Sequence, residues 1–495
     1  MLRQNLLLKC LLGLIILITI YQILLPPVVG IADNWDFHRV MGVYGISHIP
    51  TEFYDKFFRY FNLRYNINLK FDSAYFFSWF SSTNLLAAPA ILLNRILSKD
   101  GLFDIRSLGI LHALIVWIGL ALILFSLRGT SKWNQRIIGS LLVLIFSDVG
   151  YVQYYNSFYS QTIALGAFLI VVGSTLQLIT IEKTAHLKGW LPGLFCLGSI
   201  LFVTAKPQHR PLGLMLLLWW IWFFYLRKDR WKPIPFSRSL VAILITASII
   251  FSSLLRYPAG IDTSIYFDSI FLGILPISSN PQEDLKALGF SNPEKYVFLA
   301  GLSASSKTSA AVYNNDPALL STLDKIRYSG IIKFYVTHPI HLFKLLRSGA
   351  PKVFSMRSGF GNFTKDTGLP HNSQSKAFNL WSQLKERIGP SNSRYLAIFF
   401  AINLLGIILV RFGILNKNES MKRLAEFHLV LISMAISEFC IVMLANPIID
   451  KARHLYLFNA ICDLCMVGLI FYLVSAFEKY AQYTLAKART AIWRI

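Results

Sequence analysis

The sequence predicts an all-α fold, namely a polytopic transmembrane helix bundle of about ten spans. Interfacial helices in the first external loop and a helix-rich external domain complete this fold class. Of the 495 residues, 55% are hydrophobic and only 15% are charged, whereas a soluble domain carries about 25% charged residues. Apolar runs of roughly 20 residues recur along the whole chain, and this is the length that crosses a hydrocarbon core of about 30 Å.

The predicted spans fall into two groups, an N-terminal transmembrane region at 1–256 and a C-terminal one at 395–495. The first apolar run is too long for a signal peptide and lacks a small-residue cleavage site, so we expect it to remain as a span. By length and hydropathy the spans are expected at 7–28, 107–127, 136–153, 161–181, 191–205, 211–226, 239–256, 395–415, 424–446 and 455–477.

Lysine and arginine gather before the first predicted span and in every second loop after it. The positive-inside tendency places these loops in the cytoplasm, together with both termini. The net charge of +23 is explained in the same way, so we expect contact with anionic lipid and no nucleic-acid partner. The chain is therefore expected to be an integral, multi-pass protein of a bacterial inner membrane. Representative cations of these loops are Arg3, Arg128, Lys183, Arg227, Lys417 and Lys487.

Two long segments then fall outside the membrane. The first external loop, 29–106, contains the aromatic, mixed-charge run "TEFYDKFFRYFNLRYNINLKFDSAYFFSWFSS", which is typical of helices lying at the membrane interface. The second segment, 257–394, combines helical periodicity with Pro and Gly stops and with turn signals such as "SSNPQED" and "YNNDPA". We expect this segment to form the external domain.

The stretch "GIADNWDFHRVMG" follows the first span directly and places Asp33 and Asp36 at the external membrane surface. A carboxylate beside cations such as Arg39 suits general-base displacement of a phosphate. Helix capping, or an ion pair with Arg39, is the alternative explanation. The two carboxylates with a few waters could also hold Mg²⁺ or Mn²⁺, although no cysteine or histidine pattern predicts a dedicated metal site.

Three more polar groups are predicted on the external face. "SDVGYVQYYNSFYSQ" carries Asp148, Asn156 and Gln161, which an interfacial aromatic belt does not explain. Both "VTAKPQHRPLG" and "NPIIDKARHLYLFN" crowd cations into short external turns, against the usual charge asymmetry. These cations favour a phosphate or pyrophosphate site, with snorkelling to lipid head groups or a salt bridge at the bundle end as alternatives. The cations are Lys206, His209, Arg210, Lys451, Arg453 and His454.

Taken together, these segments resemble multispan glycosyltransferases of the GT-C type, especially bacterial surface-glycan hexosyltransferases that use polyprenyl-phosphate sugars. "DNWDFHRVMG" is similar to the Asn-x-x-Asp-Phe-x-Arg-Val-Met stretch of that group, with Asp36 at its acidic position. "YNSFYSQ" resembles its Asn-Ser-Phe-Tyr segment, but Gln161 stands where an acid is expected. "AKPQ", "GFGNF" and "ARHLYLFN" are similar to further segments.

The resemblance implies an inverting transfer of a hexose from a polyprenyl-phosphate donor to a glycan or lipid-linked acceptor on the external face. It makes Asp36 the general base, with Asp33 as the alternative. The residues expected to hold the donor phosphate are Arg39, Lys206, Arg210, Arg453 and His454. Those expected to contact substrate otherwise are Asn34, His38, Asn156, Tyr159 and Gln208.

Two other functions stay open at this point. Glu438 and Asp463 lie within predicted spans, and charged groups there also suit a transporter or flippase of lipid-linked saccharides. The sequence shows no paired halves of the kind that many transporters have. The chain could also be a non-catalytic subunit of a surface-polysaccharide assembly complex, in which case its external acids and cations would tolerate replacement.

Overall fold

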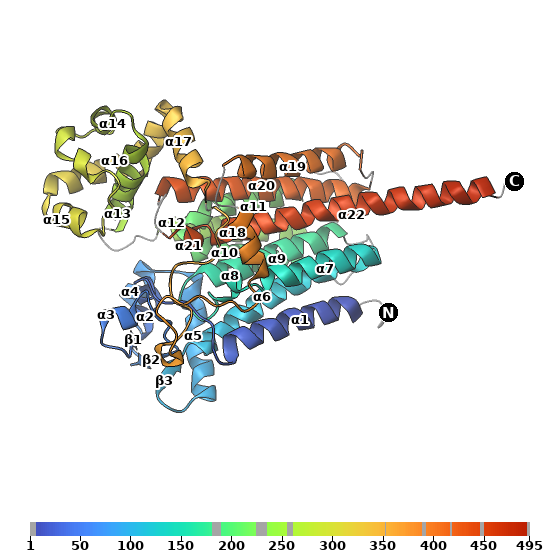
Figure 1. Ribbon diagram of the computed structural model, residues 1–495, viewed down its shortest axis with the longest axis horizontal. Coiled ribbons are helices and arrows are strands. Elements are labelled where there is room, and N and C mark those ends of the chain that lie inside the picture. The colour runs from blue at the N-terminus through green and yellow to red at the C-terminus, as the bar shows by residue number, and fades with distance from the viewer. Residues whose placement is uncertain are drawn as a thin grey trace.

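The computed structural model describes residues 6–180, 190–223, 235–254, 261–351, 353–388, 393–415, 418–445 and 450–492. Long helices run side by side along the longest axis of the molecule (Figure 1). The start of α1 (Leu6–Leu24) and the end of α22 (Tyr456–Ile492) lie at one end of this bundle, and both long polar segments lie at the other. The two segments therefore share one face, opposite the termini. Of the cations named above for the loops, Arg3, Lys183, Arg227 and Lys417 are outside the described residues.

Within the described residues, six helices are long and apolar enough to cross a membrane. Helix α9 lies at their centre, with 89% of its apolar window buried. Glycines let α6 and α9 approach closely, because a Cβ at Gly119 would lie 2.5 Å from Leu169 and one at Gly166 would lie 2.6 Å from Ile115. Besides α1 and α22, the six are α6 (Arg106–Ser126), α9 (Gln161–Thr180), α19 (Ser393–Arg411) and α20 (Glu419–Ala445).

The prediction of about ten spans is not confirmed. Four other predicted spans coincide with α7 (Lys132–Phe146), α10 (Trp190–Ala205), α11 (Arg210–Ile221) and α12 (Pro235–Leu254). Within the described residues, the apolar part of each of these four helices is shorter than any of the six membrane-spanning helices. The predicted span 136–153 breaks at Ser147, because Asp148 caps the separate short helix α8 (Val149–Val152) by accepting a bond from Gly150 N at 2.7 Å. Helix α10 ends at a turn around Lys206.

The first external loop folds mainly into helices but also into a small sheet, which an all-α prediction does not contain. Antiparallel strands run in the order β1-β2-β3, with Tyr65 opposite both His48 and Phe103. Tyr65 and Phe103 are fully buried, so this pair of opposed side chains anchors the sheet in the core. The elements are α2 (His38–Tyr44), β1 (Ile46–His48), α3 (Phe53–Lys56), β2 (Arg64–Ile67), α4 (Ser73–Ser78), α5 (Ser82–Leu97) and β3 (Leu102–Asp104).

The second long segment, predicted as one external domain at 257–394, is divided into two parts. The helices of residues 261–349 form a peripheral unit beyond the end of the bundle (Figure 1). Residues 353–388 instead return to the first loop and the bundle, where Ala32 N donates to Gly361 O at 2.9 Å and Asn362 Nδ2 to Gly30 O at 2.8 Å. The peripheral helices are α13 (Ile261–Asp268), α14 (Pro281–Ala287), α15 (Lys307–Asn315), α16 (Pro317–Thr337) and α17 (Pro339–Gly349).

A buried ion pair fastens α18 (Leu380–Ile388) to the bundle. Lys385 Nζ lies 2.8 Å from Asp463 Oδ1, and the two side chains are 7% and 4% exposed. The other carboxylate oxygen accepts hydrogen bonds from Trp381 Nε1 at 3.0 Å and from Tyr151 OH at 2.6 Å. Because both oxygens of Asp463 are satisfied, this charge contributes to holding the returning segment in place.

Removing one partner of this pair is expected to destabilise the protein strongly. Lys385→Met leaves the Asp463 carboxylate buried without a cation, which costs about 3–5 kcal/mol. The double variant Lys385→Met/Asp463→Asn should recover part of that loss, because the unpaired charge is removed. The measurement is thermal unfolding in detergent. Lys422→Met, in a more exposed pair with Glu419, is the control and should change stability by less than about 1 kcal/mol; an equal loss in both single variants would contradict the assignment.

Candidate functional site

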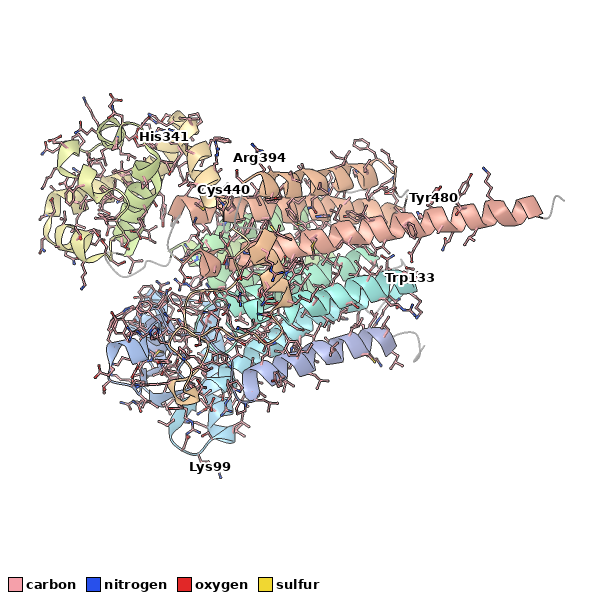
Figure 2. All side chains as sticks on the ribbon, in the orientation of Figure 1. Lys99, Trp133, His341, Arg394, Cys440 and Tyr480 are labelled. Atoms are coloured by element: carbon pink, nitrogen blue, oxygen red, sulfur yellow. The ribbon has the colours of Figure 1, made fainter. Side chains whose placement is uncertain are left out.

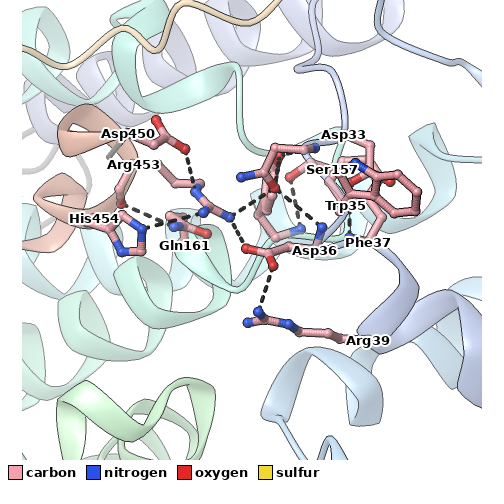
Figure 3. Close-up of polar contacts among 12 residues, drawn as sticks. Asp33, Trp35, Asp36, Phe37, Arg39, Ser157, Gln161, Asp450, Arg453 and His454 are labelled. Atoms are coloured by element: carbon pink, nitrogen blue, oxygen red, sulfur yellow. Dashed lines mark hydrogen bonds and ion pairs between the residues drawn. The ribbon is translucent and has the colours of Figure 1, made fainter. Parts of the chain in front are cut away.

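A cluster of charged side chains lies where the first external loop meets the turn before α22 (Figure 3). The Asp36 carboxylate accepts from Arg39 Nη2 at 2.7 Å through one oxygen and is ion-paired with Arg453 Nη1 through the other. Arg453 Nε lies 2.7 Å from Asp450 Oδ2. We call Asp36, Arg39, Asp450 and Arg453 the Asp36–Arg453 cluster. It joins residues that are 417 positions apart in the chain.

Three segments position this cluster. Asp36 sits in the turn before α2, and its N–H donates to Asn34 Oδ1 at 3.3 Å. The same Asn34 oxygen accepts from Tyr159 OH at 2.9 Å and from Arg453 Nη1 at 3.2 Å. Gln161 Nε2, at the start of α9, donates to Arg453 O at 3.1 Å. Thus the residues after α8 link the acidic turn to the short helix α21 (Lys451–His454).

Burial and opposite charge set the ionisation of the cluster. Burial alone would raise the pKa of Asp36, but the charges of Arg453 and Arg39 outweigh it and hold that pKa well below its usual range. Burial also opposes the charge on Arg453, yet Asp36 and Asp450 together raise its pKa above the ordinary value. Arg453 is 7% exposed and Asp36 is 22% exposed. The carboxylate is therefore ionised and reachable, while the cation behind it is nearly enclosed.

Asp33 faces in a different direction from Asp36. Its oxygens accept from Phe37 N at 3.1 Å and meet His48 Nε2 at 3.1 Å, and the residue is 2% exposed. Burial raises the pKa of Asp33. The two carboxylates therefore do not converge on a common point, and both are occupied by nitrogen donors. This arrangement does not fit the Mg²⁺ or Mn²⁺ site considered above, and no group of three or more acidic, His or Cys side chains suited to a metal occurs among the described residues.

Lys206 is electrostatically coupled to the cluster from the turn after α10. Burial first, and the charge of Arg453 second, lower the pKa of Lys206 to about 7, while the charges of Asp36 and Glu438 oppose this change. Its neighbour Gln208 is directed elsewhere, since Gln208 Nε2 donates to Glu438 Oε1 at 2.7 Å on α20. Arg210 begins α11, one turn further along the chain. Lys206 is thus linked to Asp36 through its charge.

Of the remaining predicted residues, His454 lies at the cluster, His38 lies at the surface and Asn156 belongs to the buried scaffold. The His454 ring lies 3.5 Å from Arg453 Nη2, and burial together with that charge keeps its pKa well below the ordinary value, so the ring is neutral. His38 is exposed, with its ring edge-on to Trp79 at 5.3 Å. Asn156 is fully buried and donates to Ile23 O at 2.9 Å and Val29 O at 2.8 Å. Asn156 therefore fixes the end of α1 and is not available to contact substrate.

Two residues of this region escaped the sequence-based prediction. His48 pairs with Asp33 through the sheet, and no local pattern indicates a pairing between residues 15 positions apart. Trp35 lies between Asn34 and Asp36 in the acidic stretch. This position is the one sequence feature that could have marked Trp35 as a candidate. Its backbone has a φ of 84°, a value that sequence inspection does not reveal for a tryptophan.

The fold and the cluster define an integral membrane protein with a charged site at the end of its helix bundle opposite both termini. The chain belongs to the family of the YfdI N-terminal transmembrane domain, whose model matches residues 2–490. No curated protein and no solved structure matches the chain.

Anion binding near Lys206 is expected to weaken as the pH rises through 7. A lysine with a pKa of about 7 goes from roughly nine-tenths protonated at about pH 6 to roughly one-tenth at about pH 8. Asp36 stays ionised and His454 stays neutral over this interval, so neither masks the change. Calorimetric titration with sulfate, whose own charge is constant here, should show affinity falling by up to about tenfold.

Lys206→Arg is the matched control for this titration. A guanidinium stays charged at neutral pH, so sulfate affinity in this variant should be independent of pH over the same interval. A pH-independent wild type, or an equal slope in the arginine variant, would show that another group governs anion binding.

Proposed function

We propose that this protein is a GT-C-type membrane glycosyltransferase that transfers a hexose from a polyprenyl-phosphate donor to a glycan or lipid-linked acceptor, with inversion at the sugar carbon. The observation that carries the proposal is a partly exposed carboxylate, Asp36, held between two guanidinium groups beside the last membrane helix. Membership of the YfdI N-terminal transmembrane domain family supports the same class of enzyme.

The donor phosphate would bind at Arg453, Arg39 and Lys206. Guanidinium groups bind phosphate oxygens through paired, charge-assisted hydrogen bonds. Arg453 lies in α21, just before α22 begins at Tyr456, so a lipid whose tail stays in the bilayer could bring its head group to this point. Phosphate oxygens would compete with the Asp36 carboxylate for the same N–H donors, and the ion pair would open to admit the donor.

Opening of the ion pair would also change the basicity of Asp36. A carboxylate clamped by two cations is a weak base, whereas an efficient general base has a pKa closer to the working pH. Once phosphate takes over the guanidinium donors, the pKa of Asp36 rises. The carboxylate then accepts the proton of the acceptor hydroxyl as its oxygen bonds to the sugar carbon. The bond from that carbon to the phosphate oxygen breaks, its electron pair stays on the phosphate, and Arg453 stabilises the charge.

The arrangement of the bundle supports a site on the outer face of a bacterial inner membrane. Both termini lie at the opposite end of the bundle from the cluster (Figure 1), and the positive-inside tendency places the termini in the cytoplasm. The transporter alternative is weakened at Asp463, because both of its oxygens are engaged by Lys385, Trp381 and Tyr151. A carboxylate saturated in this way is poorly suited to carrying a coupling ion.

Asp36→Asn is expected to abolish most transfer. Asparagine keeps the size of the side chain but cannot take a proton, and loss of a general base costs about 10²–10⁴-fold in turnover. The measurement is transfer of label from a polyprenyl-phosphate hexose in membranes with matched protein levels. Asp33→Asn should cost less, because Asp33 orients the loop through His48 and Phe37.

Asp366→Asn is the control for this assay, because Asp366 is exposed and lies outside the cluster; it should leave turnover unchanged. Wild-type turnover in Asp36→Asn would remove Asp36 from the proposed role, and a larger loss in Asp33→Asn would transfer the role to Asp33.

Arg39→Ala is expected to raise the KM for the donor about tenfold with a smaller effect on kcat. One charge-assisted hydrogen bond to phosphate is worth about 1.5 kcal/mol, and the side chain of Arg39 is 43% exposed. The assay is the initial rate against donor concentration. Arg64→Ala, which breaks an exposed pair with Asp100 in the same loop, is the control. Equal donor KM values in both variants would exclude Arg39 from donor binding.

A further inference from the structure

Building on the proposed function, we infer that the exposed ring of Trp35, together with Phe53 and Phe57, binds a sugar ring of the acceptor glycan. We call these three residues the aromatic platform. The Trp35 ring stacks on Phe57 with centroids 4.2 Å apart and planes 12° apart, and Phe53 supports it at 5.6 Å. Trp35 is 50% exposed and Phe57 only 8%. One face of the indole is therefore covered from below, and the exposed area lies on the rest of the ring.

The backbone at Trp35 favours a binding role over a packing role. Its φ of 84° lies in the left-handed region, which bulky side chains rarely adopt and which glycine or asparagine occupies more readily. Strained residues of this kind concentrate at ligand sites, where the surrounding structure holds them in place. A half-exposed tryptophan contributes little to folding stability through burial, and its strained backbone costs free energy. A contribution to stability therefore does not explain why a tryptophan stands at this position.

Trp35 of the platform and Asp36 are consecutive residues of one turn. Asn34 Oδ1 accepts from Asp36 N at 3.3 Å and so contributes to fixing the turn. In the view of Figure 3, the Trp35 ring lies on the side of Asp36 away from Arg453. An acceptor sugar stacked on Trp35 would thus present its hydroxyls to the carboxylate from one side, while the donor phosphate meets Arg453 on the other.

The surroundings of the platform favour a saccharide over lipid. Helix α3, which carries Phe53, lies beyond the outer ends of the bundle helices (Figure 1). Aromatic belts that contact lipid lie at the span ends, whereas the platform lies beyond them; Trp133 and Tyr480 lie at the opposite end of the bundle (Figure 2). Charged groups lie on the α3 side of the platform, with Arg59 over the Tyr54 ring at 4.0 Å and Lys365 Nζ 2.7 Å from Asp55. An apolar ring beside charged groups matches a sugar, which has apolar C–H faces and a hydroxyl edge.

Saturation-transfer NMR tests this inference with the detergent-solubilised full chain. The probe is a set of short oligosaccharides cut from the delipidated surface polysaccharide of the producing cell. Wild type should give signals from the sugar C–H protons. Trp35→Asn should weaken binding about tenfold, although asparagine suits the local φ and should not lower the thermal unfolding temperature. Trp35→Phe should retain part of the binding because a ring remains.

Trp133→Ala, a 60% exposed tryptophan at the other end of the bundle, is the matched control and should bind as wild type does. Equal binding by wild type and Trp35→Asn, or no binding by wild type, would overturn the inference. The assay needs no transfer reaction. A wild type that binds the oligosaccharides through Trp35 but transfers no hexose would therefore contradict the proposed function alone, and one that transfers hexose with an unchanged acceptor KM in Trp35→Asn would contradict the platform alone.

Discussion

The buried guanidinium of Arg453 is the interaction on which the rest of the site depends. A nearly enclosed cation is costly unless its charge is paired and its N–H groups are bonded. The charge of Arg453 is paired with both Asp36 and Asp450, and its Nη1 group donates to Asp36 and to Asn34. Because Asp36 and Asn34 come from the first loop and Asp450 from the turn before the last span, this one side chain joins the two ends of the chain.

That requirement also explains the local structure around the acidic turn. Asp33 is directed inward to His48 and to the N–H of Phe37, and this contact leaves Asp36 on the outer side of the turn. Asn34 connects the same turn to Tyr159. The small sheet that carries His48 is thus part of the support of the site, since without β1 the inner carboxylate would lose its contact with His48.

A second polar network, around Asp463 and Asp148, lies deeper in the bundle and holds the returning segment 353–388 in place. Asp463 is ion-paired with Lys385 and accepts hydrogen bonds from Trp381 and Tyr151. Asp148 accepts a hydrogen bond from the N–H of Ser382 at 2.9 Å. These contacts hold α18 against the bundle and hold residues 353–388 over the first loop. The returning segment therefore belongs to the scaffold of the site, whereas the peripheral helices α13–α17 lie further out. Of the two charged residues named within predicted spans, Asp463 is thus engaged in holding α18, and Glu438 accepts a hydrogen bond from Gln208.

The amino-acid sequence by itself determined that the chain is a membrane helix bundle, that its two long polar segments share one face, and that Asp36 and Arg453 are charged residues on that face. These properties follow from the length and polarity of individual segments. Each segment that crosses the bilayer must be long and apolar enough by itself, so its own residues predict it. Only the tertiary structure decided that Asp36 rather than Asp33 meets the cations, that Gln208 faces Glu438, that Asn156 holds the end of α1, and that part of the first loop forms a sheet. Each of these depends on which side chains the packed helices bring into contact. Such contacts join residues far apart in the chain, as Asp36 and Arg453 are separated by 417 positions. A local pattern of residues cannot predict them.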